Sequence, residues 1–205
     1  GQHPAHAKAA AEIARSGFDH LFNRTGHDCA PLLGDIGVWR KYGGVMDELQ
    51  PLLARIRGCR LCAGEMPNAP NPVFRADWRA RILVASQAPG NLADRSGTPF
   101  NDPSGVRLRE WMGVGEAEFY DASRVAIVPM GFCFPGHDAK GGDLPPMKRC
   151  AAEWRAALLS RLPDIRVTLL IGGYAQRWHL GSRAGRTLTD TVARWREFAG
   201  DGLYP

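Results

Sequence analysis

The sequence has no apolar run long enough to cross a bilayer, which takes about 20 consecutive residues. Its first residues, Gly1-Gln2-His3-Pro4, have neither the basic stretch nor the apolar stretch of a secretory signal. We therefore expect a cytoplasmic protein without membrane contact. Cysteine is scarce as well, with 5 in 205 residues. Since thiols stay reduced in the cytoplasm, we expect these cysteines to be metal ligands or buried thiols rather than disulfides.

Acidic residues are scarce in the last third of the chain. Residues 147–205 contain ten Lys or Arg against five Asp or Glu, which accounts for the whole formal net charge of +5. Clustered cations favour a polyanion such as DNA, because binding releases the counterions of the phosphates. A solvated helical face has the same composition, so charge alone leaves both interpretations open.

Four of the five cysteines have a spacing typical of metal ligands. Cys59 and Cys62 form a Cys-x-x-Cys pair, which puts two thiolates on one turn, and Cys133 and Cys150 follow far downstream. The four can hold one centre only if the fold returns the last two to that turn. Four thiolates suit zinc and an iron–sulfur cluster equally well. Cys29 lies apart and is interpreted as a free buried thiol.

Short apolar runs alternate with segments of helical periodicity. Runs with the composition of buried strands are residues 81–85, 125–128 and 167–171. Helical spacing is found at residues 45–57, 104–112, 148–162, 174–180 and 188–198. Ser104 is expected to cap the second of these helices. The alternation predicts an α/β domain with a short parallel sheet, in which ligands bind beyond the carboxyl ends of the strands.

The turn after the first strand carries an unusual string. It is Ser86-Gln87-Ala88-Pro89-Gly90, followed by Gly97-Thr98-Pro99-Phe100. Together with the order and spacing of the four cysteines, this string resembles the uracil-DNA glycosylase superfamily, and most of all its iron–sulfur, family-4 branch. The resemblance covers about residues 59–181. It implies a three-layer αβα sandwich and an enzyme that flips a uracil out of DNA and hydrolyses its N-glycosidic bond.

The resemblance also implies roles for single positions. Phe100 stands where the family stacks an aromatic ring on the flipped base, and Gln87 and Ala88 begin the turn whose amides face a uracil carbonyl. The four cysteines would hold a 4Fe–4S cluster in a structural role, with zinc as the alternative metal. The implied partner is uracil-containing or damaged DNA, bound by a monomer. The cations expected to contact this DNA are Lys140, Lys148 and Arg149.

Three features depart from the family pattern. Gln87 replaces a glutamate implicated in water activation, and an amide cannot take a proton as a general base. Asp102 and Asp94 are the candidate replacements, and Asp102 is preferred because it is closer to the stacking ring. Pro129 replaces an asparagine that pairs with the base. The superfamily also ends in a fourth strand and a His-Pro loop, whereas this sequence stops at residue 205.

We therefore divide the chain into a helical N-terminal appendage of unknown role, residues 1–44, and a uracil-DNA glycosylase-like domain, residues 45–205, without its last strand and His-Pro loop. One hypothesis for its function is a base-excision repair glycosylase acting on uracil or a related damaged base. The other is a catalytically impaired nucleic-acid-binding protein of the same fold with a four-cysteine metal site. A small electron-transfer protein is disfavoured, because the cysteines are scattered through an α/β fold.

Overall fold

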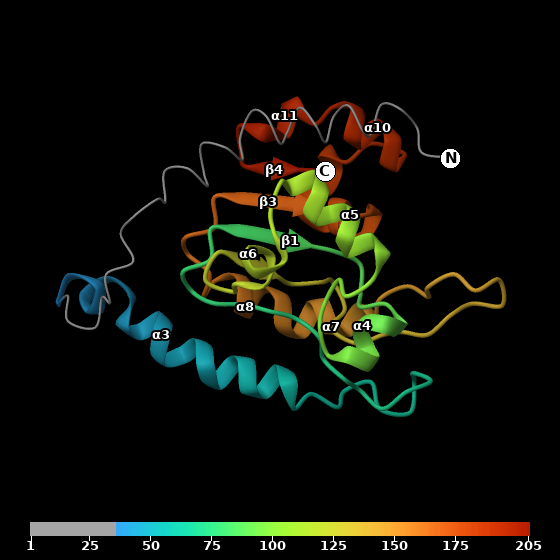
Figure 1. Ribbon diagram of the computed structural model, residues 1–205, viewed down its shortest axis with the longest axis horizontal. Helices are drawn as coiled ribbons and strands as arrows, with labels where there is room; N and C mark the ends of the chain where they lie inside the picture. Colours follow the sequence, from blue (N-terminus) through green and yellow to red (C-terminus); the bar gives the residue numbers. More distant parts are fainter. Residues whose placement is uncertain (1–35) are drawn as a thin grey trace.

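The computed structural model describes residues 36–205, except for the side chains of residues 36–43 and 45–47. Its centre is an all-parallel sheet of four strands in the order β2-β1-β3-β4 (Figure 1). The strands are β1 (Ile82–Ala85), β2 (Val125–Ile127), β3 (Val167–Leu170) and β4 (Leu203–Tyr204). In the middle of the sheet, Leu83 of β1 lies opposite both Ala126 and Thr168. The predicted α/β class with a short parallel sheet is confirmed.

Helices connect the strands and flank the sheet. The α-helices are α3 (Ile36–Arg57), α4 (Asn91–Ser96), α5 (Pro103–Met112), α6 (Glu116–Tyr120), α7 (Lys148–Cys150), α8 (Ala156–Leu159), α9 (Gly173–Leu180), α10 (Leu188–Ala193) and α11 (Arg196–Ala199). A π turn, η2 (Ala151–Arg155), and a 3-10 turn, η3 (Gly181–Arg183), complete them. Within residues 36–205, no helix has the length and apolar character that crossing a membrane requires.

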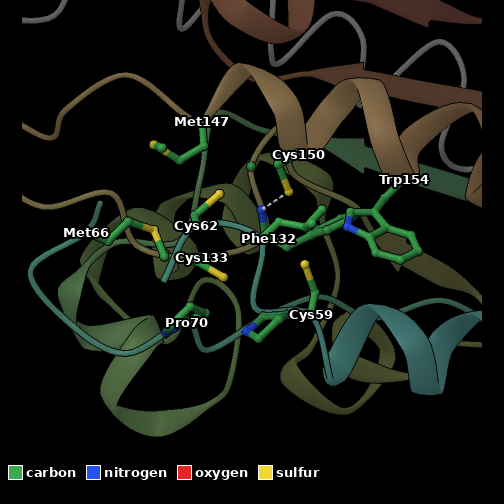
Figure 2. A pocket seen from close by; sticks show the side chains of 12 residues that line it. Cys59, Cys62, Met66, Pro70, Phe132, Cys133, Met147, Cys150 and Trp154 are labelled. Carbon is green, nitrogen blue, oxygen red and sulfur yellow. Dashed lines mark hydrogen bonds between the residues drawn. The ribbon is translucent and has the colours of Figure 1, made fainter. Parts of the chain in front are cut away.

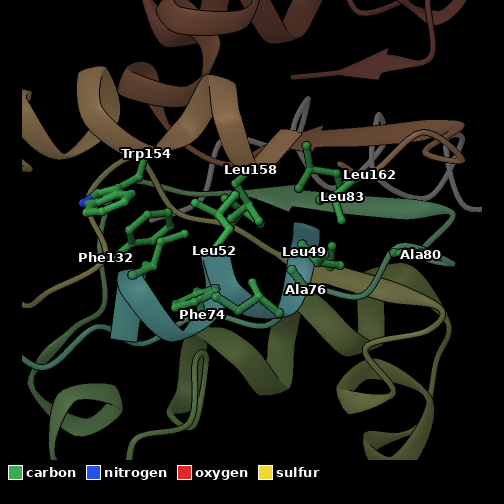
Figure 3. Close-up of a cluster of buried hydrophobic side chains, with 14 residues drawn as sticks. Leu49, Leu52, Phe74, Ala76, Ala80, Leu83, Phe132, Trp154, Leu158 and Leu162 are labelled. Carbon is green, nitrogen blue, oxygen red and sulfur yellow. The ribbon is translucent and has the colours of Figure 1, made fainter. Parts of the chain in front are cut away.

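Strand residues alternate between two cores, so helices cover both faces of the sheet. Leu83 and Ala126 pack into a core formed with α3 and α8 (Figure 3). Ile82, Val84 and Ile127 pack into the opposite core, which contains residues of α5 and α6. The result is the three-layer αβα sandwich that the family resemblance implies.

One predicted helix is interrupted in the structure. Periodicity predicts a continuous helix over residues 148–162, whereas α7 passes into the π turn η2 before α8 begins. Because a π turn forms i→i+5 hydrogen bonds, it brings residues five positions apart close together, such as Cys150 and Arg155. Single-sequence periodicity cannot detect this widening, since the apolar residues on both sides keep a helical spacing.

The last strand, expected to be missing, is present in a short form. Two residues of β4 pair with β3, with Leu203 opposite Thr168. The N–H of Thr168 also donates to the carbonyl of Gly202 (2.8 Å). The apolar pair Leu203-Tyr204 is too short to give a strand signal in the sequence.

The N-terminal prediction falls mostly outside the described residues. Helix α3 begins at Ile36, so it is longer than the predicted helix over residues 45–57, and the proposed boundary after residue 44 falls inside it. Residues 1–35, which include Cys29, are outside the part of the chain that the structure describes. The division into an appendage and a domain stays a prediction.

Candidate functional site

A cavity of about 290 Å³, here called the strand-end cavity, opens at the carboxyl ends of β1, β2 and β3. This is the edge of a parallel sheet where ligands bind. Predicted site residues in its wall are Gln87, Ala88, Phe100 and Asp102. The other lining residues are Val73, Ser86, Pro89, Gly90, Pro99, Ser104, Ile127, Pro129, Asp143, Ile171 and Gly172. Asp94 is not among the lining residues, and its Oδ2 accepts a hydrogen bond from Asn68 Nδ2 (3.0 Å).

Hydrogen bonds fix the turn after β1 to two other segments. The N–H groups of Met130 and Gly131 donate to the carbonyls of Ser86 (2.7 Å) and Gln87 (3.0 Å). The side chain of Gln87 donates through Nε2 to the carbonyl of Leu144 (3.2 Å), which belongs to the long loop of residues 134–146. Gln87 therefore fastens this loop over the cavity, a structural role that requires the N–H donor of an amide and that an ionised carboxylate, which only accepts hydrogen bonds, cannot perform.

Phe100 has a strained backbone in the cavity wall. Its φ of 56° is the one positive φ of a non-glycine residue among those described, and the left-handed region costs about 1–2 kcal/mol for such a residue. The hydroxyl of Tyr120 donates to the Phe100 carbonyl (3.2 Å), and the ring of Phe119 lies edge-on at 6.1 Å. Strain of this kind persists where the surroundings enforce it, often at functional sites.

Two carboxylates converge on Gly90. The Oδ2 atoms of Asp102 and Asp143 each lie 4.0 Å from the point that a Cβ at Gly90 would occupy. Asp102 Oδ1 accepts hydrogen bonds from the Gly105 N–H (2.9 Å) and the Ser104 hydroxyl (2.5 Å). Asp102, rather than the predicted Ser104, is therefore the N-cap of α5. Pro103 explains the shift, because proline is favoured at the first helical position.

Asp143 is a site residue that the sequence does not single out. Its Oδ1 lies 3.1 Å from Nδ1 of His137, across an antiparallel bridge inside the loop of residues 134–146. The sequence shows only an acidic residue in a Gly- and Pro-rich loop. Nothing in it indicates that this loop folds back onto the turn after β1, which is what brings Asp143 to the cavity.

The four predicted metal ligands line one second cavity, the four-cysteine cavity (Figure 2). The Cys-x-x-Cys turn follows α3, Cys133 follows β2, and Cys150 ends α7. The N–H of Phe132 donates to Cys150 Sγ (3.3 Å). Burial, with the repulsion of neighbouring thiolates added, raises the pKa of Cys133 to about 12 and that of Cys150 to about 11. At neutral pH these thiols are therefore protonated unless a bound cation holds them as thiolates.

Four thiolates are the ligand set of both candidate groups. Zinc requires all four sulfurs at about 2.3 Å from one ion. In a 4Fe–4S cluster each of the four thiolates binds its own iron. Within residues 36–205, no group of three or more His, Cys, Asp or Glu side chains is arranged to hold a metal ion. The donor set itself, four cysteines around one cavity, fits either group.

The cations expected to contact DNA differ in their surroundings. Lys140 and Lys148 are exposed. Arg149 is exposed as well, and it also pairs with the carboxylate of Glu65 (2.9 Å) and donates to the carbonyl of Leu61 (3.1 Å). Because Leu61 lies within the Cys-x-x-Cys turn, Arg149 fastens this turn to α7 and so supports the four-cysteine cavity.

An αβα sandwich with a cavity at the strand ends, lined by an aromatic residue and two acidic residues, defines an α/β protein with a candidate binding site at the sheet edge. The family described as the Uracil DNA glycosylase superfamily matches residues 72–202, which is more than half of the chain. The chain therefore belongs to the uracil-DNA glycosylase superfamily, as the motif resemblance implied. The match includes the strand-end cavity, Cys133 and Cys150, whereas Cys59 and Cys62 precede it.

Proposed function

We propose that this protein is a base-excision repair glycosylase that hydrolyses the N-glycosidic bond of uracil, or of a related damaged base, flipped out of DNA. The observation that carries the proposal is the strained Phe100 in the wall of the strand-end cavity, which two carboxylates also line. A base inside a duplex can enter such a cavity only after leaving the stack. Membership of the superfamily supports DNA as the partner.

Each group around the cavity has a role in this proposal. The ring of Phe100 stacks on the flipped base. As the glycosidic bond breaks, the sugar gains positive charge, which nearby carboxylates stabilise while one of them orients the attacking water. We assign the water to Asp143, because Asp102 also caps α5 through its Oδ1. Asp102 contributes negative charge beside the sugar.

Base selectivity in this proposal rests on the backbone and on cavity shape. Pro129, which lines the cavity, has no side-chain donor or acceptor for a base edge. The side chain of Gln87 is bonded to the Leu144 carbonyl. The remaining polar groups are backbone groups of the turn after β1 and the side chains of Ser86, Ser104, Asp102 and Asp143, which we expect to discriminate between bases less strictly than an amide paired with the base edge. We therefore include damaged bases related to uracil among the substrates.

We propose further that Cys59, Cys62, Cys133 and Cys150 hold a 4Fe–4S cluster, which would ally the chain with the family-4 branch. Four cysteines around one cavity are the ligand set of such a cluster, and the motif resemblance to the family-4 branch supports a cluster over zinc. When bound, the cluster would cross-link α3, the segment after β2 and α7. Lys140 and Lys148 are then the cations that position the DNA backbone, while Arg149 acts within the protein.

The proposal is tested with a single-stranded oligonucleotide that carries one uracil, incubated with the full chain and then treated with alkali. Strand scission at the uracil position is expected. Phe100→Ala should lower kcat/KM by about 5- to 150-fold, because stacking contributes about 1–3 kcal/mol per base. Phe100→Tyr, which keeps the ring, is the matched control and should retain most of the activity. Equal activity of the alanine variant and the wild type would show that Phe100 does not stack on the base.

One observation favours the binding-protein alternative. The residue at the water-activating position of the family, Gln87, is an amide that is hydrogen-bonded within the fold. A non-catalytic protein would bind the oligonucleotide in a salt-dependent manner but leave its strand intact after alkali. The same assay therefore separates the two functions.

A further inference from the structure

One backbone segment, residues 127–133, belongs to both cavities. Ile127 and Pro129 line the strand-end cavity, and Gly131, Phe132 and Cys133 line the four-cysteine cavity. A shift of this segment therefore changes both sites together.

The segment is held at two points by one short stretch of chain, which runs from Cys150 through η2. The N–H of Phe132 donates to Cys150 Sγ (3.3 Å). Arg155 Nη1 donates to the carbonyls of Val128 (2.6 Å) and Pro129 (2.8 Å). Both contacts come from one turn, because Cys150 directly precedes η2 and Arg155 is its last residue.

Arg155 is a buried cation with an incomplete set of partners. Its side chain is 0% exposed, and its Nε has no hydrogen-bond partner among the described residues. Its Nη2 lies 2.9 Å from Nε2 of His179, and its Cζ lies 4.7 Å from the ring of Trp178. Within residues 36–205 no carboxylate pairs with it, so the two carbonyls after β2 are its main polar partners. Because a buried cation is costly to move away from its partners, the guanidinium holds these carbonyls firmly.

We propose that Arg155 is a positioning residue that couples the four-cysteine site to the strand-end cavity. A metal bound to the cysteines would fix Cys150, which directly precedes η2, and would so fix the turn that carries Arg155, whose guanidinium holds the carbonyls of Val128 and Pro129. The wall of the strand-end cavity then depends on the occupancy of the cysteines. This inference rests on the proposed function only in taking that cavity as the base site.

The geometry also explains why arginine is needed. One planar group contacts two successive carbonyls, His179 and the Trp178 ring at the same time. A lysine ammonium keeps the charge but cannot reproduce this fixed fork of donors. Arg155→Lys therefore keeps the positive charge and removes the hydrogen bonds that position the two carbonyls, so it tests the positioning role by itself.

Hydrogen exchange read by mass spectrometry tests the coupling without any need for base release. The amides to follow are those of Val128, Met130 and Gly131, which donate to the carbonyls of Val84 (2.9 Å), Ser86 (2.7 Å) and Gln87 (3.0 Å). The protein is compared as purified with its metal and after metal removal by ferricyanide and EDTA. The variants are Arg155→Lys and the control Arg161→Lys. Arg161 pairs with Glu48 (2.7 Å) and does not contact the segment.

We expect Arg155→Lys to keep its iron and sulfide content while these amides exchange about tenfold faster or more, because bonds to a charged donor are lost. Metal removal from the wild type should have the same effect, and metal removal from Arg155→Lys should add little. Arg161→Lys should behave as the wild type. Unchanged exchange in metal-loaded Arg155→Lys, or in the metal-depleted wild type, would overturn the inference. If Arg155→Lys does not fold, the exchange of these amides in the wild type with and without metal tests the coupling.

The outcome is independent of the proposed function. A chain that shows the coupling but releases no base would refute the glycosylase proposal and leave the role of Arg155 intact. A chain that excises uracil while its segment exchanges equally with and without metal would refute the role of Arg155 alone.

Discussion

Asp143→Asn is expected to slow uracil release by about 10²- to 10⁴-fold, the range typical of losing a positioned proton acceptor. Asparagine has nearly the same shape, and its carbonyl can still accept a hydrogen bond from His137, so the loop of residues 134–146 should stay in place. Affinity for the uracil oligonucleotide should therefore change little, and the loss should appear in kcat. Single-turnover excision kinetics combined with a binding titration measure both quantities.

Variants of the two other acidic residues, Asp102 and Asp94, show whether the effect is specific to Asp143. Asp102→Asn retains a good N-cap for α5, whereas Asp102→Ala loses the cap at a cost of about 1 kcal/mol. If Asp102→Asn releases uracil more slowly while its free energy of unfolding is unchanged, the loss is due to the missing negative charge of Asp102 and not to the loss of the helix cap. Asp94→Asn serves as the control, because Asp94 is bonded to Asn68 and does not line the cavity. Wild-type rates in Asp143→Asn, or an equal loss in Asp94→Asn, would contradict the assignment of Asp143.

Gly105→Ala is expected to be the most damaging small substitution near the site. A Cβ at Gly105 would overlap the carbonyl oxygen of Phe100 and stand 2.8 Å from the Phe100 Cβ. The backbone of Phe100 must therefore move, which breaks the bond from the Tyr120 hydroxyl and displaces the stacking ring. We expect a loss of about 3 kcal/mol of stability, at the upper end for overpacking, and a large fall in excision even where the protein remains folded. Thermal unfolding and the scission assay measure the two effects.

The matched control for this variant is Gly200→Ala. Gly200 has a helical φ of −61°, and no surrounding atom lies within 4 Å of the position that a Cβ would occupy there. Alanine at this position should leave stability unchanged or raise it slightly, because it restricts the unfolded chain. If Gly105→Ala were as stable and as active as Gly200→Ala, Gly105 would not lie as close to Phe100 as described. Helix α5 would then not hold the strained backbone of Phe100 in place.

The sequence predicts well those features that depend on local composition. The strands β1, β2 and β3 follow from short apolar runs, and the stretch from Gln87 to Phe100 stands out by its own residues, without reference to the cavity that it lines. The four-cysteine pattern requires the fold to bring Cys133 and Cys150 to the turn of Cys59 and Cys62, and the structure meets this requirement. For the strands and for the stretch from Gln87 to Phe100, the signal lies in neighbouring residues, whereas the cysteine pattern combines a local Cys-x-x-Cys pair with two distant positions.

Features that depend on contacts between distant segments could not be predicted. Asp143 reaches the strand-end cavity because Leu144 accepts a hydrogen bond from Gln87, 57 positions away. The role of Arg155 depends on a π turn and on two carbonyls after β2. The prediction of Ser104 as the N-cap of α5 is wrong for a local reason, since both Asp102 and Ser104 are good capping residues and Pro103 decides between them.

The proposed function requires the strand-end cavity to cleave the glycosidic bond of a flipped base. The most direct measurement is the amount of free uracil released from an excess of a uracil-containing single-stranded oligonucleotide by the full chain, quantified by mass spectrometry beside the abasic sites formed. We expect equal amounts of both products, exceeding the amount of protein, and neither product from a matched thymine oligonucleotide beyond the background. Tight binding of the oligonucleotide with no free uracil would contradict it.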